Sequence, residues 1–385
     1  MEDFLQLDVQ LSDPERIIRD TVSRYVRDSV VPKIENAYEE GYFPKEFIQE
    51  TANLGLLGLT LPEAYGGSEA SYVSYGLVCQ ELERGDSGLR SFVSVQSSLC
   101  MYPIFRYGSE AQKKRWLPLM AQGEVIGCFG LTEPDSGSDP SSMRTTAEKV
   151  QGGWRLNGSK TWITNAPFAD LALLWAKTGE GIRGFLVEKE FKGFERIEIK
   201  HKLSLRASST GELILNNVFV PDENYLPGSE RGLGAPLSCL TEARFGIAWG
   251  AIGAAQACFD IARDYTLTRT QFGKPIASFQ LVQKDLAEMF IEIVKAQCLN
   301  LQLAHLKDEH KITPTMVSLA KLNACRTALK VARTSRNLLG ANGISLEYHV
   351  IRHMTNLESV FTYEGTDNIH TLVVGRHLTG INAFE

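Results

Sequence analysis

The stretch Phe129-Gly-Leu-Thr-Glu-Pro-Asp-Ser-Gly-Ser-Asp139 decides how the rest of the chain is interpreted. It begins as an apolar run typical of a strand and then presents hydroxyls, small residues and backbone amides in succession. Such a surface is suited to hydrogen-bonding a polar ligand or a pyrophosphate, although an ordinary turn has the same composition. We therefore predict a strand followed by a candidate binding loop.

Around this loop the hydrophobic period is that of strands. Short apolar runs are separated by turn sequences such as Asn157-Gly158 and Asn216-Asn217. The predicted strands cover 125–132, 153–162, 171–177, 184–189, 194–200 and 211–220. Residues 124–232 are therefore expected to form a central β domain.

Residues 1–123 show helical periodicity instead. Ser12-Asp-Pro-Glu15 has the Ser-x-x-Glu spacing of a capping box, which predicts the start of a helix. We expect Pro32 to end that helix, and further helices over Pro44–Leu54 and Tyr72–Arg84.

Residues 233–385 return to helical periodicity in long segments, predicted over 234–268, 279–311 and 313–339, with a last helix after Gly365. Ala and Leu occur on more than one face of these segments, which favours packing against other helices on two sides. A homo-oligomer is expected on this ground, while one large monomeric bundle would show the same periodicity. The order of the domains is helical, β, helical, which is an α+β multidomain class.

The composition bounds the function. The 385 residues are 43% hydrophobic and 22% charged, which is enough for a packed core and suggests two or three domains at roughly 150 residues each. A net charge of −6 gives no basic excess, so no nucleic-acid partner is predicted. The longest uncharged stretches, 91–105 and 245–259, are shorter than the roughly 20 apolar residues that cross a bilayer, so no membrane span is predicted.

The cysteines and the N-terminus bear on location. The seven cysteines are an odd number without a C-x-x-C pair, and we interpret them as buried free thiols in a reducing compartment. The first residues lack the features of a signal or transit peptide. These features favour the bacterial cytoplasm, or the mitochondrial matrix if the chain is a processed eukaryotic protein.

Three further segments carry more polar and aromatic groups than a core requires. They are Trp162-Ile-Thr-Asn165, the pair Arg269-Thr-Gln-Phe-Gly273 and Phe279-Gln-Leu-Val-Gln283, and Tyr363-Glu-Gly-Thr366. The last places a lone carboxylate beside a glycine whose backbone can approach a ligand closely. Each segment taken singly is better explained as a turn, an edge strand, an interhelical loop or a helix entry.

Familiar catalytic motifs are absent from the sequence, including a Walker A loop, G-x-S-x-G, H-E-x-x-H and a strand-to-helix G-x-G-x-x-G. His349 and His353 stand at i, i+4, but two ligands without a third make a weak metal site. No metal is predicted.

Together and in this order, the four segments resemble those of the acyl-CoA dehydrogenases, and the resemblance covers essentially the whole chain. It implies an FAD flavoprotein, usually homotetrameric, with an N-terminal α-helical domain, a central β-sandwich or barrel-like domain and a C-terminal four-helix bundle. Residues 89–99, 203–208, 245–249 and 347–353 are most similar to the glutaryl-CoA dehydrogenase branch of the family.

The resemblance implies removal of the α proton of an acyl-CoA with transfer of the β hydride to the flavin. Glu364 matches the family's catalytic base. Such a base needs desolvation, so that its pKa lies nearer that of its task. The Glu364 N–H and a flavin ribityl hydroxyl would stabilise the thioester oxygen as it gains charge.

The same matching implies a flavin site. The binding loop and the end of the neighbouring strand would line the flavin ring, Thr366 would contact the cofactor near the base, and the interhelical residues would reach its adenosine and pyrophosphate from a neighbouring subunit. The implied residues are Phe129, Leu131, Thr132, Gly137, Ser138, Trp162, Ile163, Thr164, Arg269, Phe272, Gln280, Gln283, Gly340, Gly343 and Thr366. The family more often has two adjacent glycines where this chain has Gly340-Ala341.

Arg90 bears on the substrate. An arginine at the far end of the acyl pocket requires an anionic partner, because a buried unpaired charge is costly. The γ-carboxylate of glutaryl-CoA would supply it, with Ser91 adding a hydroxyl. Spacing equally allows Arg90 to pair with Glu83 or Asp86 in a helical turn. For CoA and the acyl thioester, the matching positions are Ser138, Cys239, Leu240, Arg244 and Gly365.

The expected reaction is oxidative decarboxylation of glutaryl-CoA to crotonyl-CoA and CO2, in the degradation of lysine, tryptophan or glutarate. Electrons would pass to electron-transfer flavoprotein. Glu83, Ser91 and Tyr363 are expected to moderate the hold of Arg90 on the carboxylate, because binding substrate and transition state equally gives no acceleration. The alternatives are a non-decarboxylating enzyme, a short-chain acyl-CoA dehydrogenase with a structural Arg90, and a non-catalytic flavin-binding protein.

Overall fold

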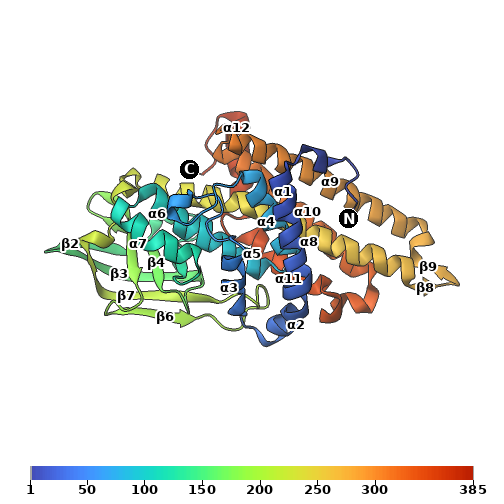
Figure 1. Cartoon of the computed structure of the whole chain (residues 1–385), viewed down its shortest axis with the longest axis horizontal. Coiled ribbons are helices and arrows are strands. Elements are labelled where there is room, and N and C mark those ends of the chain that lie inside the picture. Colours follow the sequence, from blue (N-terminus) through green and yellow to red (C-terminus); the bar gives the residue numbers. More distant parts are fainter. Residues whose placement is uncertain (1, 385) are drawn as a thin grey trace.

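The computed structural model describes residues 2–384 and has the predicted order of parts. Figure 1 shows a β domain at one end of an elongated molecule and long helices extending to the other end. The N-terminal helices lie along one side of both. The expectation of an α+β multidomain fold is confirmed.

The N-terminal part is helical throughout. Its first helix starts with the predicted capping box, in which the Ser12 amide donates to the Glu15 carboxylate at 2.7 Å. The helices are α1 (Asp13–Tyr25), α2 (Val31–Glu40), α3 (Glu46–Asn53), α4 (Tyr72–Gly85), α5 (Ser87–Ser94), α6 (Tyr102–Tyr107) and α7 (Glu110–Ala121).

The prediction that Pro32 ends the first helical run is wrong. A π-helical segment, Val26–Val30, follows α1 directly, and Pro32 stands in the first turn of α2. A proline is tolerated there because the amide that it lacks has no partner in a helix's first turn.

The β domain is a seven-stranded mixed sheet with strand order β1-β4-β2-β3-β7-β6 and β5 paired to β4. The strands are β1 (Gly127–Gly130), β2 (Thr146–Val150), β3 (Gly153–Thr164), β4 (Leu171–Thr178), β5 (Gly181–Glu188), β6 (Phe194–Glu198) and β7 (Thr210–Pro221). Six correspond to the predicted strands and β2 was not predicted. The short polar strand β2 is defined by its antiparallel pairing with β3, and only one of its five residues, Ala147, is buried.

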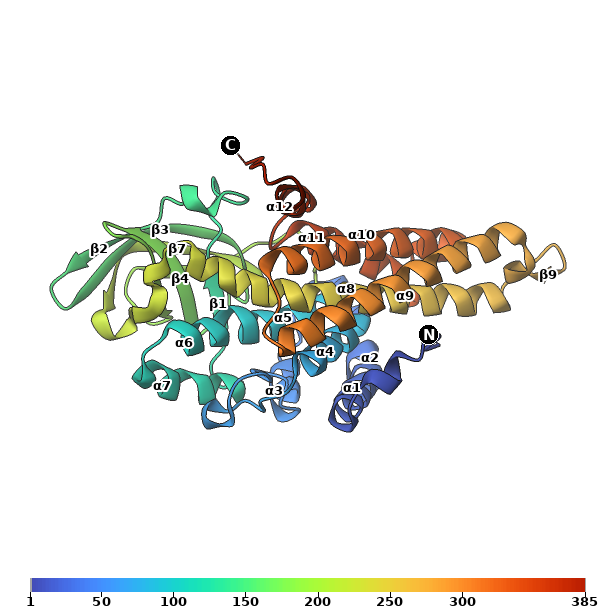
Figure 2. The same ribbon diagram turned by 90° about the horizontal axis from the view of Figure 1, so that it is seen from above.

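The C-terminal part is built on three long helices, α8 (Gly234–Thr268), α9 (Gln280–Asp308) and α10 (Pro314–Leu338), at the predicted positions. Figure 2 shows α8 running from the β domain to the opposite end, where the small β8–β9 hairpin (Thr270–Gln271 and Lys274–Pro275) turns the chain into α9. Two shorter helices, α11 (Val350–Thr362) and α12 (Asp367–Thr379), complete this part. By length and composition α8 could cross a membrane, but 89% of its most apolar window is buried inside the protein, as in the core helix of a soluble domain.

The largest core joins both helical parts, because buried residues from α1, α4 and α5 cluster with those of α8 to α11. Contact between α4 and α8 is close where the backbone carbonyl of Gln80 meets Gly253, since a Cβ on Gly253 would lie 1.9 Å from that oxygen. The seven cysteines are free, as predicted, and six of them are buried, whereas Cys298 is half-buried. Residues from α4, α5, α8, α10 and the α11–α12 connection are thereby brought together.

Candidate active site

Glu364 lies in the short connection between α11 and α12, with an unusual backbone. Its φ is +53° and that of Gly365 is +100°, so two successive residues adopt left-handed conformations. The Oε2 atom of Glu364 is shielded from solvent and has no hydrogen-bond partner in residues 2–384. Burial raises the pKa of this carboxyl, an effect that the positive charges of Arg90, Arg244 and Lys321 partly oppose. A buried, unpartnered carboxyl with a raised pKa has the properties of a general base.

Two cations hold the backbone around this carboxyl. The buried Lys321 of α10 donates to the carbonyls of Phe361 (3.3 Å), Tyr363 (2.8 Å) and Gly365 (2.8 Å). Arg244 of α8 donates from Nε to the Glu364 carbonyl at 2.6 Å. Charge-assisted hydrogen bonds thus fix every carbonyl from 363 to 365.

The amide of Glu364 is free to bind a ligand, because no acceptor for it exists among the described residues. Thr366 caps α12 by accepting a hydrogen bond from the Ile369 amide at 3.3 Å. Gly365 has little room for a side chain, since a Cβ there would lie 2.7 Å from Nε2 of the buried His370. Gly365 is therefore required both by its positive φ and by the packing of His370 against it.

Arg90 is 1% exposed and lies beside this connection. Its Nε donates to Oε2 of Glu83 at 2.6 Å, and its Nη2 donates to the hydroxyl of Tyr363, the residue before Glu364. Burial opposes the charged form of Arg90, but the carboxylate of Glu83 raises its pKa well above the ordinary value. Ser91, the next residue of α5, is also buried. Glu83, Arg90 and Tyr363 are thus in direct contact, and Ser91 is their neighbour only through its position in α5.

Gly250 of α8 makes the Arg90–Glu83 pair possible. A Cβ at this position would lie 2.0 Å from Oε2 of Glu83 and 3.1 Å from Nε of Arg90. Only glycine leaves room for both side chains.

Asp86 does not pair with Arg90, which excludes one of the two partners that the spacing allowed. Its carboxylate caps α5 by accepting from the Gly88 amide at 2.6 Å, and it also accepts from Arg352 and from Nδ2 of Asn356 at 2.9 Å. Both of the last two residues belong to α11. The helix that carries Arg90 is therefore tied to the helix that leads to Glu364.

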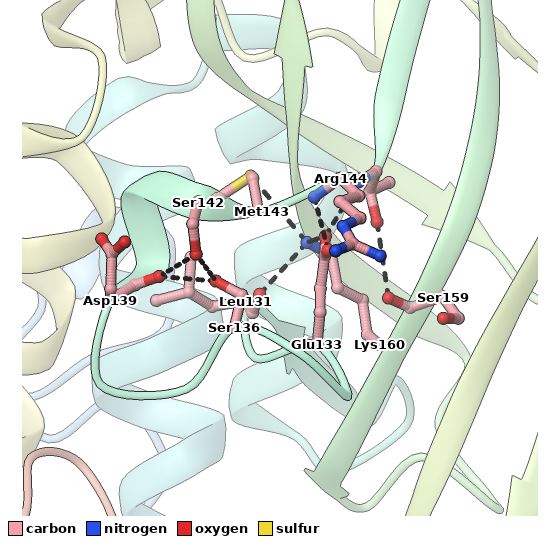
Figure 3. A network of polar contacts seen from close by, with 10 residues as sticks. Leu131, Glu133, Ser136, Asp139, Ser142, Met143, Arg144, Ser159 and Lys160 are labelled. Carbon is pink, nitrogen blue, oxygen red and sulfur yellow. Dashed lines mark hydrogen bonds and ion pairs between the residues drawn. The ribbon is translucent and has the colours of Figure 1, made fainter.

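The binding loop after β1 is held by a buried ion pair that Figure 3 shows. Nζ of Lys160 lies 2.8 Å from Oε1 of Glu133 and also donates to the Leu131 carbonyl at 3.1 Å. Glu133 accepts in addition from the amides of Arg144 (2.5 Å) and Thr145 (3.0 Å). The loop is closed further by Ser136, whose hydroxyl donates to the Asp139 carbonyl at 2.6 Å.

Several of the predicted flavin residues could contact a ligand through their backbone but not through their side chains. Phe129, Leu131 and Ile163 are buried in the core, and the Thr132 carbonyl accepts from the Thr161 amide at 2.9 Å. Gly137 and Ser138 are exposed, and their amides donate no hydrogen bond within residues 2–384. These free amides match the expectation of donors for a polar ligand.

Trp162, near the end of β3, has an exposed aromatic side chain. It is 63% exposed, has a φ of +61°, and falls where the β3–β7 ladder is interrupted between Lys160 and Ile163. Thr164, two residues on, is half-buried at the end of β3. An exposed indole and a loop with free backbone amides are the groups that a flat heterocycle with a polar edge requires, so these residues fit the FAD that the resemblance implies.

The remaining predicted flavin residues lie at the opposite end of the chain. Arg269, Phe272, Gln280 and Gln283 are exposed at or next to the β8–β9 hairpin, which Figure 2 places far from the β domain, and Phe272 is 91% exposed. The Gly340–Ile344 turn lies at the same end, because Nδ2 of Asn342 donates to the Tyr265 hydroxyl of α8 at 3.1 Å. Gly343 packs on the Arg336 carbonyl, and Gly340 is exposed with a φ of +60°. One chain does not bring the two groups together.

The predicted CoA positions differ in accessibility. Ser138 is exposed and Leu240 is half-buried. Cys239 is fully buried, and its thiol lies 3.3 Å from the Ala235 carbonyl, so this side chain packs beneath the surface. Arg244 contacts the Glu364 carbonyl, as described above.

Reasoning from the sequence missed Lys321, Gly250, Glu133 and Lys160. Lys321 had a recognisable signal, because it interrupts the small and apolar face of α10 made by Val317, Ala324 and Ala328. The other three contact partners that are distant in sequence, and no local pattern identifies them. His349 and His353 do not form a metal site: His353 is buried against Arg352, and residues 2–384 contain no group of three or more metal-ligating side chains.

Three family models cover most of the chain. The acyl-CoA dehydrogenase N-terminal domain matches residues 12–124, the middle domain 128–218 and the C-terminal domain 230–379. A glutaryl-CoA dehydrogenase from Desulfococcus multivorans is 36% identical over 97% of this chain and 99% of its own length.

Solved structures agree with the family models. The crystal structure of a glutaryl-CoA dehydrogenase from Mycobacterium smegmatis in complex with FADH2 is 51% identical, with a TM-score of 0.98 over 100% of this chain and 99% of that one. A structure of a glutaryl-CoA dehydrogenase with glutaryl-CoA is 36% identical, with a TM-score of 0.93 over 96% of each chain. The three family models and these relatives together show that this chain belongs to the acyl-CoA dehydrogenase family of FAD-dependent oxidoreductases.

Proposed function

We propose that this enzyme oxidises and decarboxylates glutaryl-CoA to crotonyl-CoA and CO2. The single observation that carries the proposal is the buried guanidinium of Arg90, which contacts the residue beside the base. A cation at that place would be a penalty for a plain fatty acyl chain and an anchor for a terminal carboxylate. The names of the relatives described above support the same substrate.

Glu364 removes the α proton of the thioester. Its Oε2 has no competing hydrogen bond, and its raised pKa brings its basicity nearer to that of a weakly acidic C–H. The free Glu364 amide donates to the thioester oxygen as that oxygen becomes negative. When bound, FAD supplies the acceptor for the β hydride.

In the proposed reaction, the pair of Arg90 with Glu83 would permit the loss of CO2. Nε and Nη2 of Arg90 are engaged within the protein, which leaves Nη1 to meet the γ-carboxylate. Glu83 already offsets part of the charge of Arg90. Arg90 therefore positions the γ-carboxylate of the substrate but binds it weakly enough for CO2 to be released. The C–C electron pair then delocalises into the thioester, and protonated Glu364 returns its proton to the γ carbon.

Partners and location complete the proposal. We assign electron-transfer flavoprotein as the acceptor on the basis of the family. The distance of the β8–β9 hairpin from the β domain supports a homo-oligomer in which a neighbour completes each flavin site, and we propose the tetramer that is usual in the family. Seven free cysteines support a reducing compartment, in keeping with a cytoplasmic enzyme.

A second candidate is a short-chain acyl-CoA dehydrogenase in which Arg90 is structural. The direct ion pair between Arg90 and Glu83 favours this reading, because it already neutralises the cation.

Activity assays on glutaryl-CoA and butyryl-CoA, with the wild type and Arg90→Met, distinguish the two candidates. We expect Arg90→Met to lower kcat/KM for glutaryl-CoA by at least about a hundred-fold, from the loss of a buried charged hydrogen bond, and to affect butyryl-CoA far less. Equal losses on both substrates would overturn the anchor role.

A further inference from the structure

Lys321 is a buried cation without a direct counter-ion. It is 1% exposed and takes part in none of the ion pairs among residues 2–384; the nearby carboxylates of Glu364 and Asp367 act on it only at longer range, and Asp367 pairs with Arg326 instead. Burying an ammonium group is costly, so each of its three N–H groups is expected to have a strong acceptor. Those acceptors are the carbonyls of Phe361, Tyr363 and Gly365, at 3.3, 2.8 and 2.8 Å.

Capping of α11 alone does not explain these contacts. A lysine near a helix C-terminus commonly satisfies the last carbonyls, and the contact with Phe361 is of this kind. The Gly365 carbonyl, however, lies beyond the end of α11 at Thr362 and belongs to the connection that carries Glu364. The ammonium group of Lys321 therefore donates hydrogen bonds to the backbone on both sides of Glu364.

The contact with Tyr363 has a specific electronic consequence. The carbonyl of residue 363 and the amide of residue 364 belong to one planar peptide unit. A cation at the carbonyl withdraws electron density from that unit and makes its N–H a stronger donor. This N–H is the free amide of Glu364 that faces a thioester oxygen in the proposed reaction.

We propose that Lys321 is a positioning residue that acts through the backbone: it fixes the left-handed conformation at Glu364 and polarises the Glu364 amide toward the substrate's thioester oxygen. The inference rests on the proton abstraction of the proposed function but does not depend on which acyl group is bound. Arg244 has the equivalent position on the next peptide unit, with Nε 2.6 Å from the Glu364 carbonyl.

The test compares Lys321→Met with Cys325→Ala. Cys325 stands one turn further along α10, is buried, and contacts the Val360 carbonyl through Sγ at 3.7 Å, so its truncation disturbs the same helix contact but removes no hydrogen bond to residues 363 to 365. Each flavin-loaded variant is mixed with crotonyl-CoA carrying a 13C label at the thioester carbonyl. The stretching frequency of that carbonyl is then measured by infrared difference spectroscopy.

In the wild type and in Cys325→Ala we expect the carbonyl stretch to be shifted well below its value in free crotonyl-CoA. In Lys321→Met the stretch should move back toward the free value, and kcat should fall by at least about ten-fold with little change in KM, because removal of an oxyanion donor outright costs about a hundred-fold or more. An unchanged frequency in Lys321→Met would overturn the proposal even if the variant were less stable.

Lys321→Gln keeps N–H donors but no charge, and it replaces Lys321→Met in the same comparison if the methionine variant does not fold. The frequency in the glutamine variant should then lie between those of the wild type and free crotonyl-CoA, and a wild-type value would contradict the role of the charge. A wild-type enzyme that turns over neither glutaryl-CoA nor butyryl-CoA would contradict the proposed function instead.

Discussion

Asp86 and Arg352 form an ion pair in which both side chains are at most 1% exposed, and it joins the start of α5 to α11. Because α5 carries Arg90 and α11 leads to Glu364, this pair helps to set the separation of the two ends of the substrate site. The proposed activity therefore depends on a contact that does not itself touch substrate.

Arg352→Met should destabilise the enzyme strongly. It leaves the Asp86 carboxylate buried without its cation, and breaking a buried pair in this way costs about 3–5 kcal/mol. Denaturant unfolding followed by circular dichroism measures the loss. The matched control is Arg333→Met, which breaks the exposed pair with Glu358 and should cost at most about 1 kcal/mol. Similar losses of unfolding free energy in the two variants would show that the buried Asp86–Arg352 pair stabilises the protein no more than the exposed pair does.

Gly250→Ala should disturb the substrate anchor without altering any charge. The new methyl group would lie 2.0 Å from Oε2 of Glu83, so Glu83 must move away from Arg90. We expect kcat/KM for glutaryl-CoA to fall at least about ten-fold, as expected when a charged hydrogen bond is lost, with a smaller fall for butyryl-CoA. Gly375→Ala in α12, where a Cβ meets nothing within 4 Å, is the control and should leave both values unchanged.

Glu364→Gln should abolish turnover while leaving a folded, yellow protein. The amide cannot accept the α proton, and loss of a general base costs about a hundred- to ten-thousand-fold in kcat. Stopped-flow reduction of the bound flavin measures the chemical step, and the visible spectrum reports flavin content. A variant that still reduces its flavin at more than a tenth of the wild-type rate would exclude Glu364 as the base.

The same substitution should stabilise the protein in a pH-dependent way. The pKa of Glu364 is raised in the folded state, so between its ordinary value of 4.5 and the raised value the folded protein binds more protons than the unfolded one. Stability therefore falls as pH rises through that window. Glutamine mimics the protonated carboxyl, so the thermal midpoint of Glu364→Gln should exceed that of the wild type above the window and match it below pH 4.5. A constant difference at all pH values would contradict the raised pKa.

Sequence patterns predicted the parts of the molecule that rest on local rules. The capping box at Ser12 and the long apolar periods of α8 and α10 depend on near neighbours, and they were placed almost to the residue. Strand β2 was missed because it is polar and exists through its pairing with β3. Pro32 was misread because a π-helical segment before it allows the helical run to continue.

The residues of the candidate site also divide into those that the sequence could predict and those that it could not. Glu364 and Arg90 lie in segments that could be matched to a family, whereas Gly250 and Lys321 act through residues more than 40 positions away. No local sequence pattern predicts that a glycine in α8 makes room for a carboxylate in α4. The structure is needed to show that Asp86, an equally plausible partner for Arg90 by spacing, is used by Arg352 instead.

Product analysis tests the central claim most directly. Purified wild-type enzyme is incubated with glutaryl-CoA and an artificial electron acceptor, and the acyl-CoA products are resolved by mass. We expect crotonyl-CoA, with CO2 released in equal amount. Accumulation of glutaconyl-CoA without CO2, or no oxidation of glutaryl-CoA at all, would contradict the account.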